Sequence, residues 1–316
     1  MLIIHRIPAW ILVMISLALP ARIASAHPSS GIVVDEQGQV FFQDIVGGAI
    51  WKIDTQGNLT KFYDKLGGHW MALDGEGSFA RTDLTLVKRI TPSGAKPTLL
   101  VADGGAPIVV HPEGFLYYGH VLLGGGQVAV GLTRVSPDGK HTLFSPDLKK
   151  TLEKTDDGVF GLASGPDGSI YVSTWDAVLK VTRDGTVSTV VHPVVVKDCD
   201  EDRVDHKPSN RLPCLRGLAV DAHGTVYAAA TSCHLVLKIA PDGKVETVLR
   251  AERPWSPTGV AVHGGAVYVL EYTNANGGPG EGWRPRRPSP PHRPLNRAGT
   301  ASGWRTCGRH DLRRNR

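Results

Sequence analysis

A phrase of about eleven residues recurs six times along this chain of 316 residues. It reads glycine, hydrophobic, alanine, hydrophobic, aspartate, two variable positions, glycine, one variable position, hydrophobic, tyrosine. The clearest copies are Gly161–Tyr171 and Gly217–Tyr227, and weaker copies start at Gly31, Trp70, Pro107 and Gly259. Such a repeat decides the architecture, because one unit cannot bury its hydrophobic surface alone and must stack on its neighbours.

Each repeat divides into two predicted hairpins. The first joins two short hydrophobic runs through a glycine turn. The second starts with a hydrophobic-basic-hydrophobic run and turns at an Asp-Gly pair, which supplies the positive φ that a tight hairpin needs. These runs are Trp51–Ile53, Lys88–Ile90, Thr133–Val135, Leu179–Val181 and Leu237–Ile239. Two hairpins make a four-stranded antiparallel blade. With no helical pattern of useful length between repeats, we predict an all-β, six-bladed β-propeller over residues 27–282.

Residues 1–26 have the features of a secretory signal peptide. Arg6 makes the start basic, the run Ala9–Pro20 is mostly apolar, and Ala24–Ala26 fits a small-residue cleavage site. No later stretch is apolar over the ~18 residues that a membrane helix needs. We therefore expect a soluble protein that is secreted or periplasmic, without a membrane span.

The other end of the chain, residues 283–316, is rich in arginine and proline. Ten arginines against the single acid Asp311 give it a formal charge of +9, whereas the whole chain carries +5. The sixth repeat has its first half but not its second, so we predict an incomplete last blade followed by a disordered tail. A frameshift in the gene is one hypothesis for this tail, and the other reading frames would test it. The tail has no lysine and the protein is expected to be exported, so no nucleic-acid partner is expected.

The repeats resemble NHL repeats and the wider six-bladed group that contains gluconolactonase/regucalcin-type, strictosidine-synthase-like and virginiamycin-lyase-like proteins. The resemblance covers about residues 28–275. It implies a central channel lined by the innermost strand of every blade, with a site at one mouth. It does not select a chemistry, because this fold hosts binders, lyases and hydrolases.

Aligning the six copies on this resemblance places two rings of residues around the channel. The first ring, just before each opening glycine, is Ser30, His69, Ala106, Phe160, Arg216 and Thr258. The second, at the end of the next strand, is Asp44, Asp83, His120, Thr174, Ala230 and Glu271. In regucalcin-like lactonases, the metal-binding Glu, Asn and Asp occupy the first ring. This chain has no carboxylate or amide there, so we assign no metal ligands, and the cofactor is left unidentified with a divalent cation as one alternative.

Arg216 is the candidate for holding an anion, because a guanidinium can bind a carboxylate through two hydrogen bonds. Phe160, Thr258 and Ser30 complete the predicted ligand-binding set. His69, His120 and Glu271 are the candidate acid and base groups, and they would form a transition-metal site if they converged. The alternatives are an ion pair for Arg216, a backbone contact for His69, strand-end polarity for His120 and Glu271, and a structural turn for Asp44.

The insertion at 193–213 carries Asp198, Asp200 and Asp202 in an alternating pattern. A calcium loop of the EF-hand type would need Gly at 203 and Glu at 209, where the chain has Arg203 and Ser209, so a solvated acidic loop is favoured. Cysteines flank this loop. We favour a Cys199–Cys214 disulfide, with Cys233 as the competing partner.

Two classes of function follow from these features. The first is an exported, monomeric scaffold that binds a small anionic molecule or a protein through its channel face. The second is a lyase or lactone hydrolase, gluconolactonase-like, with its site in the central channel. The classes differ in whether His69 and Arg216 face one site beside a carboxylate.

Overall fold

The computed structural model of this chain describes residues 29–45, 47–64, 68–74, 87–90, 98–102, 106–124, 127–155, 158–196, 199, 213–272, 283–288 and 306–307. The predicted signal peptide, Asp83 and the acidic residues of the 193–213 insertion lie outside these ranges. In the part that the structure describes, no helix is long and apolar enough to cross a membrane.

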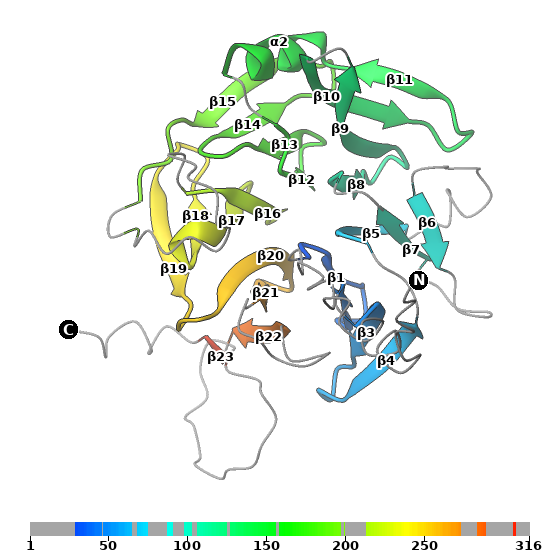
Figure 1. The fold of residues 1–316 in the computed structure, drawn as a ribbon, viewed down its shortest axis with the longest axis vertical. Coiled ribbons are helices and arrows are strands. Elements are labelled where there is room, and N and C mark those ends of the chain that lie inside the picture. The colour runs from blue at the N-terminus through cyan, green and yellow to red at the C-terminus, as the bar shows by residue number, and fades with distance from the viewer. Residues whose placement is uncertain are drawn as a thin grey trace, which may run out of the picture.

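The described strands form six small sheets around a central axis (Figure 1). Three sheets come from the first half of the chain. The first holds β1 (Ile32–Val34), β2 (Val40–Asp44), β3 (Ala49–Ile53) and β4 (Leu59–Asp64). The second holds β5 (Trp70–Asp74), β7 (Thr98–Ala102) and β6 (Val87–Ile90). The third holds β8 (Ile108–Val110), β9 (Leu116–Gly124), β10 (Gln127–Val135) and β11 (His141–Phe144).

The second half of the chain continues the same arrangement. The fourth sheet holds β12 (Gly161–Ser164), β13 (Ile170–Ser173), β14 (Val178–Val181) and β15 (Val187–Val191). The fifth holds β16 (Leu215–Val220), β17 (Val226–Ala230), β18 (Leu235–Ile239) and β19 (Val245–Arg250). The last holds β20 (Ser256–His263), β21 (Ala266–Tyr272), β22 (Trp283–Pro288) and β23 (Thr306–Cys307).

The innermost strands of the six sheets contact one another in order, and β20 returns to β1. Each pair of neighbouring sheets shares a hydrophobic cluster. In the cluster between the last and first sheets, Tyr268 and Leu270 pack with Ile32 and Phe42. The ring is therefore closed by apolar packing between its first and last sheets, and the prediction of an all-β propeller with antiparallel blades is confirmed.

Glycines allow the innermost strands to come this close. A β-carbon added to Gly161 would lie 2.0 Å from the carbonyl oxygen of Arg216. At Gly217 it would lie 2.7 Å from the α-carbon of Gly259. Real β-carbons essentially never lie so near backbone atoms, so the repeat needs glycine at these positions. The opening glycine of these copies is thus a packing requirement where their strands meet.

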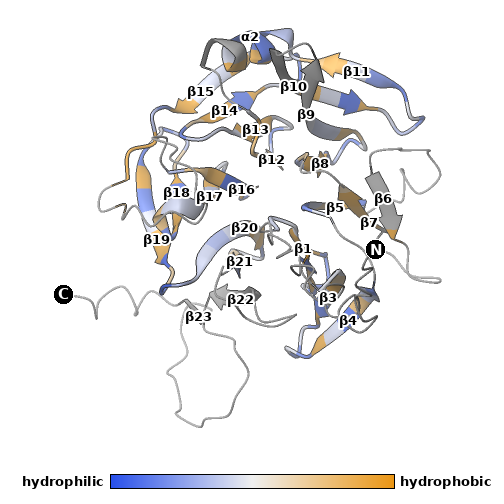
Figure 2. Ribbon diagram, in the orientation of Figure 1, coloured by the Kyte–Doolittle hydropathy of each residue, from blue (hydrophilic) through white to orange (hydrophobic). Residues whose placement is uncertain are grey.

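The outermost strands are more exposed than the second strands. The outermost strands β4 and β19 carry both polar and apolar residues, seen as bands of both colours in Figure 2. Within β4, Leu59 and Tyr63 are exposed. The second strands β2 and β13 are buried throughout. Each sheet therefore places its most apolar strands between its neighbours, and its polar edge faces outward.

Three local arrangements differ from the sequence-based expectation. In the second sheet, β7 pairs with both β5 and β6, so the strand order departs from the simple succession along the chain. The run Leu99–Val101 in β7 is fully buried, whereas the segment directly after β5 is rich in glycine and polar residues. Burying the apolar side chains of β7 therefore favours this strand, over the polar segment that follows β5, as the neighbour of the inner strand β5.

A helix, α2 (Pro146–Thr155), lies between the third and fourth sheets, although no helix was expected there. Ser145 directly precedes it, and its Oγ accepts the backbone N–H of Leu148 at 3.3 Å, as a helix cap does. Leu148 and Leu152 are four residues apart and buried in the cluster between these sheets. One face of the helix is buried through these two leucines. A pattern of two apolar residues is too weak to predict a helix from the sequence.

In the last sheet, β22 pairs antiparallel with β21 and sets Arg284 opposite Glu271. Residues 283–288 belong to the arginine- and proline-rich segment that the sequence assigns to the tail. This described part of the segment therefore supplies a third strand to a sheet that was expected to lack its second half. Residues 289–305 and 308–316 are outside the described ranges, so disorder there stays a prediction.

We predict that Gly161→Ala lowers the free energy of unfolding by about 1–3 kcal/mol, because the new methyl group meets backbone. Urea denaturation of the full chain measures this. Gly158→Ala is the matched control, since the nearest atom to its β-carbon, 3.4 Å away, belongs to the Phe160 ring. Equal stability of the two variants would contradict the packing requirement at Gly161.

The Asp-Gly turns contribute a dependence of stability on pH. Two hydrogen bonds to its carboxylate lower the pKa of Asp184. The larger effect comes from the Thr182 side chain and the smaller one from the Thr186 backbone. Ser136 and Lys140 lower the pKa of Asp138 in the same way. Since the folded pKa values are depressed, the stabilisation is present above the unfolded value of about 4 and is lost as pH falls through the folded values.

We therefore expect the urea midpoint to fall between pH 5 and pH 2.5. The double variant Asp138→Asn/Asp184→Asn should fall less steeply, because an amide oxygen still accepts hydrogen bonds but does not titrate. Midpoints measured across this range test the assignment. Identical pH profiles for variant and parent would show that these turns do not contribute.

Candidate functional site

The candidate site is the inner ring, defined as the six residues at the start of the innermost strands: Ser30, His69, Ala106, Phe160, Arg216 and Thr258. Backbone contacts connect its members. The N–H of Ser30 donates to the carbonyl of His69 at 3.0 Å. A β-carbon on Gly259 would lie 2.6 Å from the Ser30 carbonyl oxygen, and one on Gly217 would lie 2.9 Å from that of Thr258. These contacts connect the segments of Ser30, His69, Arg216 and Thr258 around the axis.

Arg216 lies at an irregularity in its strand. The pairing of β16 with β17 sets Leu215 opposite Ala230 and Leu218 opposite Ala228. Arg216 and Gly217 therefore oppose a single residue, Ala229, as in a β-bulge. Bulges re-aim side chains and are common next to binding sites. Arg216 is half-buried, and its carbonyl accepts a hydrogen bond from the Ser173 Oγ at 3.2 Å.

Thr258 lies at a second bulge, between the pairs Pro257–Glu271 and Gly259–Leu270. Its side chain is fully buried, and its hydroxyl donates to the Leu270 carbonyl at 3.4 Å. Ser30 is also buried. These two hydroxyl side chains, predicted as ligand contacts, are therefore largely covered by protein, and the half-buried ring members are His69, Ala106, Phe160 and Arg216.

The three predicted acid and base residues come from three different sheets. His69 precedes β5 and is half-buried, and its backbone N–H donates to the Ala102 carbonyl at 3.1 Å. Glu271 lies in β21 and is fully buried. His120 lies in β9 opposite Gly131, and its side chain is outside the described residues. Their convergence on one substrate stays a prediction.

Two members of the second ring, Asp44 and Thr174, form turns. Asp44 is buried, and its Oδ1 accepts the backbone N–H of Gly47 at 2.8 Å. Thr174 is buried and accepts the N–H of Ala177 at 3.1 Å. Both side chains satisfy the backbone of the tight turn that follows their strand, which is the structural role expected for Asp44. Among the described residues, no group of three or more His, Cys, Asp or Glu side chains could hold a metal ion.

Trp175 is the residue at this end of the ring that the sequence analysis did not select. It lies in the turn between β13 and β14, and its ring centroid is 4.6 Å from that of Phe160, with the planes at 53°. The Trp175 carbonyl accepts the N–H of Leu215, one residue before Arg216, at 3.1 Å. The repeat alignment offered no signal for it, because the turn lies between the two hairpins of the blade.

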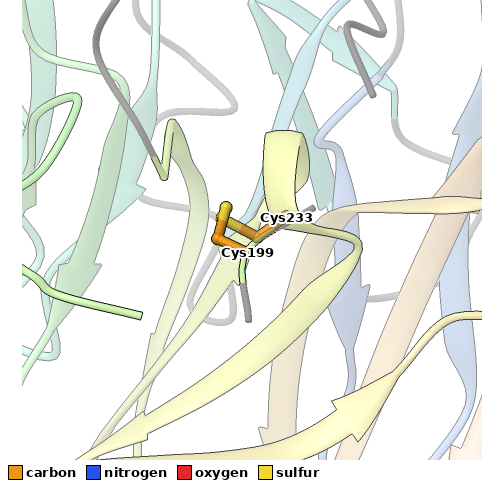
Figure 3. The surroundings of a disulfide bond; sticks show 2 residues. All are labelled: Cys199 and Cys233. Atoms are coloured by element: carbon orange, nitrogen blue, oxygen red, sulfur yellow. A yellow bond between two sulfur atoms is a disulfide. The ribbon is translucent and has the colours of Figure 1, made fainter. Parts of the chain in front are cut away.

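A disulfide joins Cys199 to Cys233 (Figure 3). The favoured pairing of Cys199 with Cys214 is therefore wrong. Cys233 ends the short 3₁₀ helix η2 (Thr231–Cys233), which follows β17. Cys214 takes no part in this disulfide, but its carbonyl accepts the N–H of Thr231 at 3.1 Å. The bond therefore ties the insertion to the fifth sheet instead of closing the insertion on itself, and a disulfide is compatible with an extracellular location.

Comparison with known proteins shows the fold. No family model and no curated protein matches the chain. Virginiamycin B lyase from Staphylococcus aureus is 14% identical, with 82% of this chain and 83% of that one covered and a TM-score of 0.47. A gluconolactonase from Xanthomonas campestris is 16% identical, with coverage of 77% and 83% and a TM-score of 0.51. A luciferin-regenerating enzyme is 19% identical, with coverage of 78% and 86% and a TM-score of 0.52.

The gluconolactonase and the luciferin-regenerating enzyme, with TM-scores above 0.5, show that this chain shares their β-propeller fold. This agrees with the resemblance seen in the repeats. The assignment to NHL repeats is a finer statement and stays a prediction. At identities below 25%, the likeness concerns the fold and not the reaction.

We expect loss of the Cys199–Cys233 bond to lower the free energy of unfolding by about 3–4 kcal/mol, from its sequence separation of 34 and the entropy of loop closure. Urea denaturation with and without dithiothreitol measures the loss. The double variant Cys199→Ala/Cys233→Ala should no longer respond to the reductant, whereas Cys214→Ala should respond as the parent does. A response that disappears in Cys214→Ala would refute the pairing.

Proposed function

We propose that this chain is an exported, six-bladed propeller of the NHL type that binds a small anionic ligand at its inner ring. The observation that carries the proposal is the placement of Arg216. It is the one inner-ring member with a permanent charge, it is half-buried, and it occupies a bulge. A cation so placed can contact a ligand at the axis while its backbone remains in the sheet.

The physical basis is the geometry of the guanidinium group. It presents five N–H donors in a plane and stays protonated at any physiological pH. Partial burial strengthens its hydrogen bonds to an anion, because the local dielectric is lower than in water. With five donors, Arg216 can bind a ligand and keep a contact to the protein. The six sheets and their closed ring hold the surrounding backbone rigid, so little entropy is lost when a ligand binds.

The alternative is an enzyme of the lyase or lactone-hydrolase class. This alternative is supported by the position of His69 in the same inner ring as Arg216. The backbone of His69 is hydrogen-bonded to that of Ser30 and of Ala102. A histidine there could transfer a proton to or from a bound anion at neutral pH. This alternative requires turnover that depends on His69, and assays of His69→Ala with lactone substrates distinguish it from binding alone.

We expect phosphate or acetate, at constant ionic strength set by sodium chloride, to raise the melting temperature of the full chain. At a concentration a hundred times the Kd, the stabilisation is about 2.7 kcal/mol. Arg216→Ala should abolish the rise, and Arg216→Lys should retain part of it, since lysine keeps the charge without the planar fork. Differential scanning calorimetry measures the shift.

Arg183→Ala is the matched control for this experiment. Arg183 is exposed and pairs with Glu113 at the turn after β14, so its loss removes one positive charge away from the inner ring. It should leave the anion response unchanged. No anion-dependent shift in the parent protein, or an equal loss in both variants, would exclude a specific anion site at Arg216.

A further inference from the structure

Two large aromatic side chains belong to segments that are hydrogen-bonded to the strand of Arg216, and they lie outside the hydrophobic core clusters. Phe160 and Trp175 are both half-buried. Neither belongs to the six hydrophobic clusters found among the described residues, nor to the side chains packed against those clusters. Their rings instead contact each other, at 4.6 Å between centroids. They form an aromatic pair of their own, with Phe160 directly before β12 and Trp175 in the turn between β13 and β14.

The backbone attaches this aromatic pair firmly to Arg216. The N–H of Phe160 donates to the Ser173 carbonyl at 2.9 Å. The Oγ of the same serine donates to the Arg216 carbonyl. On the other side, the Trp175 carbonyl accepts the N–H of Leu215 at 3.1 Å. Phe160 is therefore connected to Arg216 through Ser173, and Trp175 is connected to it through Leu215, so the strands fix these segments relative to one another.

We propose that the anion bound at the inner ring is an aromatic carboxylate, which places its ring against Phe160 and Trp175 and its carboxylate on Arg216. The inference rests on the proposed function and adds the chemical class of the ligand. Aromatic rings attract each other in tilted and offset arrangements, beyond the gain from burying apolar area. A flat ring that carries a carboxylate matches both a half-buried aromatic pair and the adjacent planar cation.

The same features argue against other small anions. Phosphate and acetate would use Arg216 alone and leave both rings exposed to water. An aliphatic carboxylate of similar size would cover the rings but would lack their edge-to-face attraction. The expected order of affinity is therefore benzoate, then cyclohexanecarboxylate, then acetate. A gain of about 1.4 kcal/mol from the ring contact corresponds to a tenfold difference in Kd.

The test uses the full chain and 4-fluorobenzoate, observed by the line width of its ¹⁹F resonance. Benzoate, cyclohexanecarboxylate, acetate and uncharged benzyl alcohol serve as competitors. We expect benzoate to displace the probe at about one tenth of the acetate concentration, and benzyl alcohol to compete weakly. Equal Kd values for benzoate and acetate would overturn the proposal, whether or not any variant folds.

Variants locate the binding surface. Trp175→Leu and Phe160→Leu should each raise the Kd of 4-fluorobenzoate about tenfold and leave the acetate Kd unchanged. Trp51→Leu is the matched control, because Trp51 packs in the cluster between the first and last sheets. A benzoate preference that survives in both ring variants would overturn the assignment to this pair.

The outcomes separate this inference from the function on which it rests. If phosphate and acetate raise the melting temperature through Arg216 but benzoate is not preferred, the anion site stands and the aromatic class is wrong. If no anion shifts the melting temperature and the ¹⁹F resonance stays sharp, both proposals fail. A broadened resonance that is unaffected by Arg216→Ala would also overturn the inference, because the carboxylate would then lie elsewhere.

Discussion

The close approach of the innermost strands is the constraint on which the rest of the structure depends. Where the innermost strands of the fourth, fifth, sixth and first sheets meet, their backbones come nearer than side chains allow. Gly161, Gly217 and Gly259 meet this condition, with neighbouring backbone within 3 Å of where their β-carbons would be. Because the strands meet there, the residues that precede them are gathered into one ring. The packing requirement and the candidate site are therefore two consequences of the same geometry.

Away from the axis, the stability of the fold comes from the faces between sheets. Every neighbouring pair shares a hydrophobic cluster, and the pair formed by the first and last sheets is no exception. Burying apolar surface is the dominant favourable term in folding, so each sheet depends on both neighbours. This explains how the ring closes although β1 to β4 come from one continuous segment and the last sheet draws β22 from the arginine-rich end.

The inner ring combines firm backbone support with irregular strands. Hydrogen bonds and close contacts connect Ser30, His69, Arg216 and Thr258, yet Arg216 and Thr258 both lie in bulges. A bulge leaves one residue outside the regular pairing, and the strand bends there. The fold thus frees the side chain of Arg216 from the regular alternation of its strand without loosening the ring. The aromatic pair Phe160–Trp175 belongs to the adjoining sheet, and in the proposed site it supplies the apolar part of the ligand contact.

The sequence by itself determined the repeat, the hairpins with their Asp-Gly turns, and hence an antiparallel all-β propeller. Hydrophobic alternation and turn chemistry act within about ten residues, so they can be read locally. Only the tertiary structure decided which buried run lies beside β5, that Cys199 pairs with Cys233, and that Leu148 and Leu152 suffice for a helix. It also decided that Trp175 lies beside Phe160 and that Ser30 and Thr258 are covered. Each of these outcomes depends on which residues, far apart in the chain, become buried against one another. The free energy gained from that burial exists only once the sheets have packed around the ring.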